Sequence, residues 1–408
     1  MKLASIAILT CAIISSAYSQ TTNTTPPPDV VQAGTGNIRV ERLATLELPW
    51  GMALLPDGRL LITEKPGRLR IWANGRLSEP VQGVPRVVYR GTQEDQGGML
   101  DVAIDPDFAR NSLVYLSYVE AADPQPSEQG ETGEARFGEM DMSDNIVRGG
   151  AVARGRLDGN QLRDVQVIWR QAPKTLGRGH FGHRLVFAPD GKLFITSGER
   201  MRFEPAQSLA SNLGKIVRIN SDGSIPTDNP FVGRANARGD IWSYGHRNML
   251  SMALDPSGRL WVVEMGPRGG DELNLIEKGK NYGWPIVSDG DNYNGSPIPD
   301  HATRKDFQAP VRSWTPVISP SGALFYTGTL FPGWRGSLLA GGLSSMSLVR
   351  ITLDGDRVSF EEWIPMKRRI RDLIQMPDGA IVVIVDDKNG DLLRLTPADA
   401  SQTRAQQP

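Results

Sequence analysis

One pattern of apolar and polar positions recurs along the chain. It consists of a short apolar segment, a turn of the form Pro-Asp/Ser-Gly, and a second apolar segment that alternates. Proline presets the first turn position, Asp or Ser caps the turn, and glycine takes the positive φ angle, so each copy predicts a β-hairpin. Clear copies lie at residues 52–63, 185–196, 252–263 and 373–384, and a looser copy at 102–108 precedes an apolar segment at 112–118.

The spacing of these hairpins indicates a repeat architecture. The gaps average a few tens of residues, which is the size of a four-stranded propeller blade. The interval from Pro256 to Pro377 has room for another blade, and residues 321–326 would belong to it. We therefore predict an all-β fold, a six-bladed β-propeller of four-stranded antiparallel blades. A pair of β-sandwiches is the alternative, but sandwich strands need not repeat one hairpin sequence.

The two ends of the chain depart from the repeat. Residues 1–19 carry Lys2, a short apolar run and small residues, and predict a cleavable signal peptide. Residues 20–37 predict a flexible leader and residues 398–408 a disordered tail, which leaves 38–397 for the propeller. The single cysteine, Cys11, lies in the predicted signal peptide, and a lipoprotein interpretation is less favoured because Thr10 is larger than the residue usual there.

Later segments lack the roughly 20 consecutive apolar residues of a transmembrane helix, so we expect a periplasmic or secreted protein without a membrane span. The stretch 121–143 has little periodicity and predicts a long loop on one face. Charges balance at 45 Lys+Arg against 46 Asp+Glu, giving a net charge of -1. Such a chain has no global field for nucleic acid, which favours a small-molecule partner.

Histidines are the first candidates for chemistry. Of the four, His180, His183 and His246 lie in glycine-containing segments that also carry arginine. Histidine is the side chain best suited to accept a proton near neutral pH, although a purely structural role remains open for each. A zinc site at His180 and His183 is less favoured, because the neighbouring glycines are poor helix formers and no H-E-x-x-H pattern is present.

Two further segments suggest ligand binding. The turn-rich stretch 264–274 contains the adjacent carboxylates Asp271 and Glu272, which suits either an oxygen-liganded Ca²⁺ or a plain surface turn. Arg369 and Arg371 stand two residues apart and would project to the same side of a strand. They form either a solvated face or a clamp for a ligand with several carboxylates.

Taken in order, six segments resemble the soluble aldose sugar dehydrogenases that depend on pyrroloquinoline quinone (PQQ), the glucose/sorbosone dehydrogenase family. The resemblance covers roughly residues 43–395 and implies a six-bladed propeller that holds PQQ and Ca²⁺ at the mouth of its channel. The matching segments are residues 96–103, 180–185, 241–248, 266–272, 280–285 and 369–372.

The resemblance also implies residue roles. His180 matches the catalytic base, Glu199 an acidic partner that orients it, and Arg247 an arginine that stabilises charge on the quinone oxygen. The implied reaction oxidises a sugar at C1 to a lactone, with proton removal by His180 and hydride transfer to PQQ. The implied cofactor contacts are Gln96, Arg247, Asn248, Arg369 and Arg371, and the backbone carbonyls of Gly266 and Pro267 are the implied Ca²⁺ ligands.

The chain departs from the family pattern at two positions. Ser344 stands where the family commonly has a lysine that reaches the cofactor, so PQQ affinity would be lower or another residue would substitute. His183 stands where glycine is frequent and is expected to narrow the pocket or change the preferred substrate. A non-catalytic propeller that binds glycans or proteins, or a metal-dependent lactonase, are the alternative functions. Neither the sugar, the electron acceptor nor the choice between monomer and homodimer follows from these residues.

Overall fold

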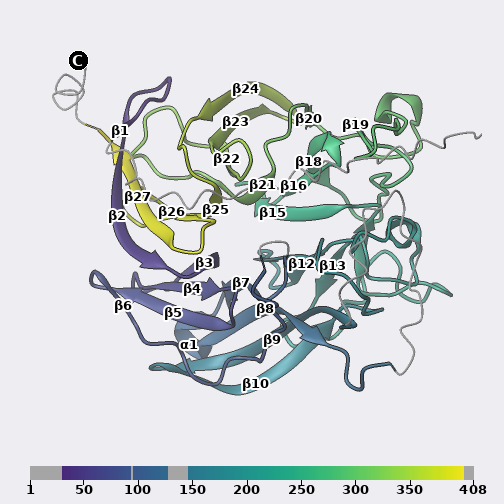
Figure 1. Ribbon diagram of the computed structural model, residues 1–408, viewed down its shortest axis with the longest axis horizontal. Helices are drawn as coiled ribbons and strands as arrows, with labels where there is room; N and C mark the ends of the chain where they lie inside the picture. The colour runs from purple at the N-terminus through teal and green to yellow at the C-terminus, as the bar shows by residue number, and fades with distance from the viewer. Residues whose placement is uncertain (1–29, 93–94, 127–145, 399–408) are drawn as a thin grey trace, which may run out of the picture.

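The structure, a computed structural model, describes residues 30–92, 95–126 and 146–398. Six antiparallel sheets, each with at least four strands, surround a central axis (Figure 1). The predicted six-bladed β-propeller is therefore confirmed. The predicted signal peptide, residues 20–29 of the predicted leader, most of the predicted loop at 121–143 and the tail from residue 399 lie outside the described residues.

Each blade is a meander whose first strand lies nearest the axis. Blade one is β3 (Pro49–Leu54), β4 (Leu60–Glu64), β5 (Arg68–Ala73) and β6 (Arg76–Leu77); blade two is β7 (Met99–Ile104), β8 (Leu113–Ala121), β9 (Arg148–Asp158) and β10 (Gln161–Arg170); blade three is β11 (Gly182–Phe187), β12 (Leu193–Ser197), β13 (Lys215–Ile219) and β14 (Ile241–Tyr244). Blade four is β15 (Asn248–Leu254), β16 (Leu260–Met265), β18 (Asp271–Ile276) and β20 (Arg312–Trp314); blade five is β21 (Pro320–Phe325), β22 (Leu338–Gly342), β23 (Leu348–Asp354) and β24 (Arg357–Ile364); blade six is β25 (Ile370–Gln375), β26 (Ile381–Val385), β27 (Gly390–Pro397) and β2 (Ile38–Leu46). Shorter elements are β1 (Val30–Val31), the pair β17 (Arg268–Gly269) and β19 (Gly290–Asp291), helix α1 (Phe108–Asn111), and 3-10 turns at Glu204–Gln207 and His301–Thr303.

The predicted hairpins join the first and second strands of their blades. Gly58, Gly191, Gly258 and Gly379 of the Pro-Asp/Ser-Gly turns have φ between 76° and 87°, the conformation for which glycine is needed. The looser copy is the connection between β7 and β8, where α1 takes the place of the tight turn. Residues 321–326 fall on β21, the inner strand of blade five.

Blade six closes the ring with strands from both ends of the chain. Strand β2 pairs antiparallel with β27, from Ile38 opposite Pro397 to Leu46 opposite Gly390. Strand β1 then pairs with β2, and Val31 is buried, so the end of the range predicted to be a flexible leader is part of the sheet. Pairing the first strand with the last protects the edges that an open ring would expose.

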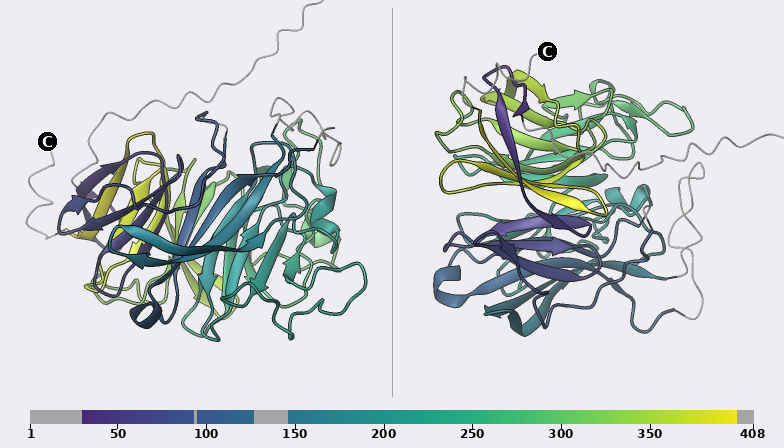
Figure 2. Two further views of the ribbon diagram at one scale, coloured as in Figure 1. Left: turned by 90° about the horizontal axis from the view of Figure 1, so that it is seen from below. Right: turned by 60° about the vertical axis from the view of Figure 1, so that its left-hand side comes forward.

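The hydrophobic core is divided among the blade interfaces. Buried clusters fill the contacts between blades one and two, two and three, three and four, four and five, five and six, and six and one. Both faces of each sheet are thus covered by a neighbouring blade, as the side views show (Figure 2). A further cluster, formed by Trp50, Leu100, Val119, Phe181 and Leu250, joins the inner strands of several blades.

The antiparallel strand order of each blade determines which segments come together at one end of the propeller, where a site can form. Because consecutive strands run antiparallel, the start of each inner strand and the end of the second strand lie at the same end of the propeller. Inner strands also carry an irregularity in pairing near their starts, for example between Met99 and Val102 and between Ile370 and Asp372. Such bulges redirect side chains next to functional sites.

Candidate active site

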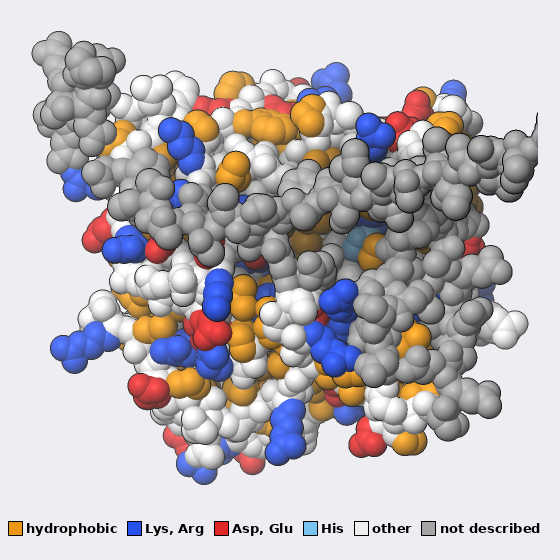
Figure 3. Space-filling model, viewed as in Figure 1, with side chains coloured by type: hydrophobic (Ala, Val, Ile, Leu, Met, Phe, Trp, Pro, Cys, Tyr) orange, Lys and Arg blue, Asp and Glu red, His pale blue; other side chains and the backbone are white. Residues whose placement is uncertain are grey.

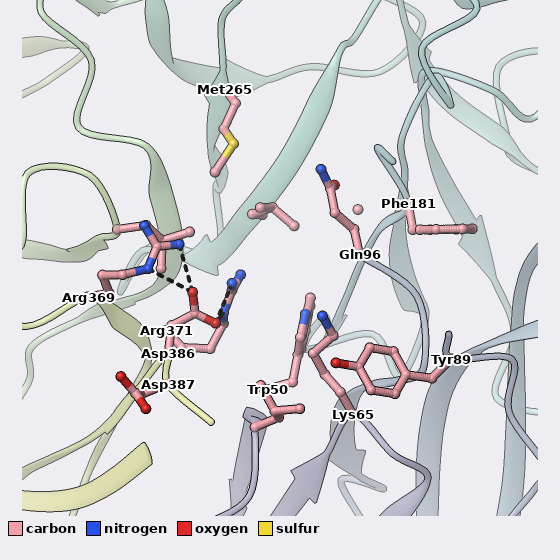
Figure 4. A pocket seen from close by; sticks show the side chains of 14 residues that line it. Trp50, Lys65, Tyr89, Gln96, Phe181, Met265, Arg369, Arg371, Asp386 and Asp387 are labelled. Carbon is pink, nitrogen blue, oxygen red and sulfur yellow. Dashed lines mark hydrogen bonds and ion pairs between the residues drawn. The ribbon is translucent and has the colours of Figure 1, made fainter. Parts of the chain in front are cut away.

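A pocket opens on the axis at the end where inner strands begin. Its lining comes from blades one, three, four, five and six and from the segment before β7, as the close view shows (Figure 4). The lining residues are Leu48, Trp50, Lys65, Tyr89, Gln96, Phe181, Gly182, Leu250, Met265, Leu343, Arg369, Arg371, Asp386 and Asp387. Over the face seen in Figure 3, acidic and basic side chains are interspersed, in line with the balanced net charge.

His180 lies just before β11 and is buried, with 6% of its surface exposed. Its Nδ1 is hydrogen-bonded to a carboxylate oxygen of Glu199, which follows β12. The other oxygen of Glu199 accepts hydrogen bonds from the backbone N–H groups of Arg202 at 2.6 Å and Phe203 at 3.0 Å. The backbone N–H of His180 donates to Gln96 Oε1 at 2.9 Å, which ties the histidine to a residue that lines the pocket.

The electrostatics of this pair favour a neutral imidazole and an ionised carboxylate. Burial and the positive charge of Arg247 lower the pKa of His180, and Glu199 only partly opposes them. Burial alone would raise the pKa of Glu199, but the contacts with His180 and the charge of Arg247 lower it below its usual range. With Nδ1–H donated to the carboxylate, Nε2 has no hydrogen-bond partner among the described residues and is the atom able to accept a proton.

Arg247 and Asn248 stand where β15 begins, next to the end of β16. Arg247 donates to the carbonyl oxygen of Gly266 at 2.8 Å, and its backbone N–H donates to Glu264 at 2.8 Å. The guanidinium lies 5.2 Å from the ring centre of Trp284. The side-chain oxygen of Asn248 is buried with no hydrogen-bond partner among the described residues, as is Nε of Arg247. These unsatisfied polar atoms are suited to a bound ligand.

Gly266 follows β16 and has no room for a side chain. A Cβ there would lie 2.3 Å from the carbonyl oxygens of both Gly269 and Gly270. Its own carbonyl faces Arg247, and its N–H donates to Asp271 at 2.9 Å. Pro267 is buried next to it. Backbone carbonyls are the oxygen ligands that Ca²⁺ accepts, so the donor type of this turn fits the ion.

The adjacent carboxylates of this segment do not converge on one point. Asp271 accepts from the backbone N–H groups of Gly266 and Ser319, whereas Glu272 contacts His301 at 3.0 Å. Both are buried, so the alternative of a plain surface turn is wrong. Burial raises the pKa of Asp271 to about 7. Among the residues that the structure describes, no three His, Cys, Asp or Glu side chains gather, whereas the lactonase alternative needs a carboxylate-rich metal site.

Arg369 and Arg371 project to the same side, as predicted. Both guanidinium groups contact the carboxylate of Asp386, with the shortest distances 2.7 Å in each case (Figure 4). Burial raises the pKa of Asp386, but the charges of Arg371 and Arg369 outweigh it and hold that pKa well below the usual range. Lys65 also lines the pocket, as does Asp387, so the described lining carries three cations against two carboxylates and its net charge is positive.

His183 does not narrow the pocket, so that expectation is wrong. It falls in the irregular pairing between Gly182 and Leu185, and its fully buried ring points away from the pocket toward Gly150 and Trp169. A Cβ on Gly150 would lie 1.5 Å from Nε2 of His183, so glycine there makes room for the imidazole. Neither ring nitrogen has a partner among the described residues. Among the described residues, no further His, Cys, Asp or Glu side chain gathers with His180 and His183 as a zinc site would need.

Several pocket residues escaped the sequence analysis. Trp50, Lys65, Tyr89 and Asp386 lie outside the segments that drew attention, yet all line the pocket. Lys65 and Asp386 each directly follow the second strand of a blade, the position that Gly266 has in blade four. An alignment of the repeated hairpins would have shown that the residue after each second strand occupies an equivalent position in every blade.

Comparison with known proteins agrees with the fold. The profile of the Glucose / Sorbosone dehydrogenase family matches residues 46–394. The chain is thus a β-propeller of the sugar dehydrogenase class. It belongs to the glucose/sorbosone dehydrogenase family.

Three relatives show how far the likeness extends. Aldose sugar dehydrogenase YliI of Escherichia coli is 41% identical over 375 residues, which cover 90% of this chain and 94% of the relative. The apo-form crystal structure of the soluble aldose sugar dehydrogenase from Escherichia coli has a TM-score of 0.80 at 39% identity, covering 88% of this chain and 100% of that one. The PQQ-bound aldose sugar dehydrogenase of Streptomyces coelicolor has a TM-score of 0.68 at 26% identity, covering 91% of this chain and 99% of that one.

Proposed function

We propose that the protein is a PQQ- and Ca²⁺-dependent dehydrogenase that oxidises aldose sugars at C1 to lactones. The observation that carries this proposal is the buried pair of His180 and Glu199 beside a pocket with excess positive charge. A relative that binds PQQ shares the fold and covers nearly the whole described chain.

The residues fit the cofactor. PQQ is a planar tricarboxylate, and the pocket offers Arg369 and Arg371 for its charges. Asn248 has a buried side-chain oxygen without a partner among the described residues, and Gln96 lies between His180 and the pocket. The carbonyls of Gly266 and Pro267 would hold the Ca²⁺ ion.

The protein's own groups handle the proton. PQQ, when bound with Ca²⁺, supplies the acceptor for the C1 hydrogen and its electron pair. Nε2 of His180 takes the proton of the anomeric hydroxyl, and Glu199 fixes the required tautomer and stabilises the imidazolium that forms. Arg247 places positive charge close to the base and to the Gly266 carbonyl, where it stabilises negative charge developing in the site.

Reconstitution tests the proposal. Apo-protein is loaded with PQQ and Ca²⁺ and assayed by dye reduction against a panel of aldoses and simple alcohols. We expect activity with one or more aldoses, a lactone product, and loss of activity in H180A with unchanged thermal unfolding. Absence of turnover over the whole panel would contradict the proposal. A glycan- or protein-binding propeller would also fail to take up PQQ, which a fluorescence titration detects.

We also propose that the chain is exported to the periplasm or beyond. Support comes from the apolar and small-residue pattern of residues 1–19. None of the described helices has the length or the apolar character needed to span a bilayer. N-terminal sequencing of the mature protein from a fractionated host should give a start close to Gln20, whereas a protein retained in the cytoplasm with Met1 would contradict export.

A further inference from the structure

Lys65 is a buried cation that the proposed chemistry has not yet used. It directly follows β4, and 9% of its surface is exposed. Its backbone is fixed on both sides, since its N–H donates to the Leu48 carbonyl at 3.0 Å and its carbonyl accepts from Met99 at 3.0 Å. A Cβ on Gly98 would lie 2.2 Å from the Lys65 carbonyl oxygen, so the neighbouring segment packs directly on this backbone.

The ammonium group has a backbone partner and forms no ion pair with a carboxylate of the described residues, although the charges of Asp386 and Asp95 act on it. Nζ donates to the carbonyl oxygen of Asp95 at 2.6 Å and lies 4.9 Å from the ring centre of Tyr89. The carboxylate of Asp95 is bound by Arg148 at 3.0 Å, and that of Asp386 is shared by Arg369 and Arg371. Burial is the main cause that lowers the pKa of Lys65 to about 8. A buried ammonium is costly unless an anion compensates it, so this position is suited to an anionic ligand.

Among the described residues that line the pocket, the segment after β22 supplies no cation. Leu343 lines the pocket, but the next residue is Ser344, whose exposed hydroxyl is hydrogen-bonded to the Ser319 hydroxyl at 2.6 Å. In Figure 4, Lys65 and Trp50 lie on one side of the pocket and Arg369, Arg371 and Asp386 on another. A ligand with several carboxylates placed between these walls can contact cations on both.

We propose that Lys65 binds a carboxylate of PQQ and supplies the cationic contact that Ser344 cannot. This inference rests on the proposed function. It makes the cofactor site a three-cation site in which Arg369 and Arg371, already paired with Asp386, act together with an ammonium group that forms no ion pair with a described carboxylate. A lysine contributes a single strongly hydrated point charge, so its effect should be electrostatic and dependent on its protonation.

The test is a titration of apo-protein with PQQ at saturating Ca²⁺, followed by tryptophan fluorescence, which requires no turnover. K65M should bind PQQ about tenfold to a hundredfold more weakly than the wild type, the range for losing a charged hydrogen bond. K305M is the matched control, because Lys305 is exposed and does not line the pocket, and its affinity should equal that of the wild type. Equal affinity of folded K65M and wild type would overturn the inference.

A pH series gives a second readout that a structural role would not produce. Free Lys65 loses its proton near pH 8, so wild-type affinity should be constant below that pH and fall up to tenfold per unit above it. The facing groups are the Asp386 and Asp95 carboxylates, the Arg371 and Arg148 guanidinium groups, and the Tyr89 phenol, whose pKa is raised by burial. The profile of K65M should be flat over the same range.

The outcomes separate the inference from the proposed function. If the wild type does not bind PQQ, the proposed function itself fails. If the wild type binds PQQ with the same affinity from pH 6 to pH 10, only the role of Lys65 fails. If thermal unfolding shows that K65M does not fold, the role of Lys65 is tested by the wild-type pH profile and by K65R, which keeps the charge. K65R should then bind more tightly at pH 10 than the wild type does.

Discussion

Exchanging Glu199 for glutamine tests how the proposed base is held. One carboxylate oxygen of Glu199 accepts hydrogen bonds from the backbone N–H groups of Arg202 and Phe203. In E199Q the amide oxygen must keep facing these donors, so the amide NH₂ turns toward Nδ1 of His180. The imidazole then accepts at Nδ1 and carries its proton on Nε2, where the base is needed.

The size of the effect follows from this tautomer exchange. Holding a histidine base in the wrong tautomer lowers kcat by about 10⁴ in a serine protease, which corresponds to about 5 kcal/mol of activation free energy. We expect a loss of about 10³ to 10⁴ in E199Q, measured by dye reduction with saturating PQQ, Ca²⁺ and aldose. PQQ affinity should stay within about threefold, since Glu199 does not line the pocket. If E199Q retains more than a tenth of wild-type kcat, the assignment of His180 and Glu199 as a base and its orienting partner is refuted.

Four further predictions concern His183, Gly150, Asp255 and the proposed Ca²⁺ ion. Burial lowers the pKa of His183 to about 3, so between pH 6.5 and pH 3 the unfolded chain binds a proton that the folded chain does not. The free energy of unfolding should therefore fall by up to about 1.4 kcal/mol per pH unit as the pH drops from 6.5 toward 3. Urea unfolding at pH 7 and pH 5 should show this slope, and H183N should flatten it. G150A, whose Cβ would collide with the His183 ring, should cost about 3 kcal/mol, and H183A should restore part of it, whereas an unchanged Tm for G150A would contradict the packing. Asp255 caps the turn between β15 and β16 by hydrogen bonds with Ser257, Arg259 and Trp261. Burial raises the pKa of Asp255, but these contacts outweigh it and lower that pKa to about 2. D255N should therefore lower the free energy of unfolding by about 2 kcal/mol at pH 7, and by progressively less as the pH falls from 4 to 2. Chelation with EGTA should abolish PQQ-dependent turnover and added Ca²⁺ should restore it, and activity that survives EGTA would argue against a Ca²⁺ ion at Gly266 and Pro267.

The fold was predictable where the determinants are local. The Pro-Asp/Ser-Gly turns specify hairpins through residues within a few positions of one another, and their repetition indicated the blades. The closure of blade six was not predictable in this way. Its partners β2 and β27 lie at opposite ends of the chain, and the pattern of β2 gives no sign of which strand it will join.

The site was predictable where a motif or a simple period carries the signal. Arg369 and Arg371 were placed on one side by strand alternation, and both side chains do reach Asp386, although the strand pairing is irregular between Ile370 and Asp372. His183 was misplaced because its strand pairing is irregular there, so the period of two does not determine its direction. Lys65 was missed because a lone lysine in a turn carries no chemical pattern, and only the register of the blades brings it to the pocket.

The central claim, that His180 accepts a proton while bound PQQ accepts the electrons of an aldose, is tested most directly by a single turnover. Protein loaded with one equivalent of PQQ and Ca²⁺ is mixed anaerobically with excess aldose in a stopped-flow spectrometer. We expect full reduction of the bound PQQ by the wild type, and PQQ binding without reduction on the same timescale by H180N. Reduction of PQQ at equal rates by the two proteins, or no reduction by the wild type with any aldose, would contradict it.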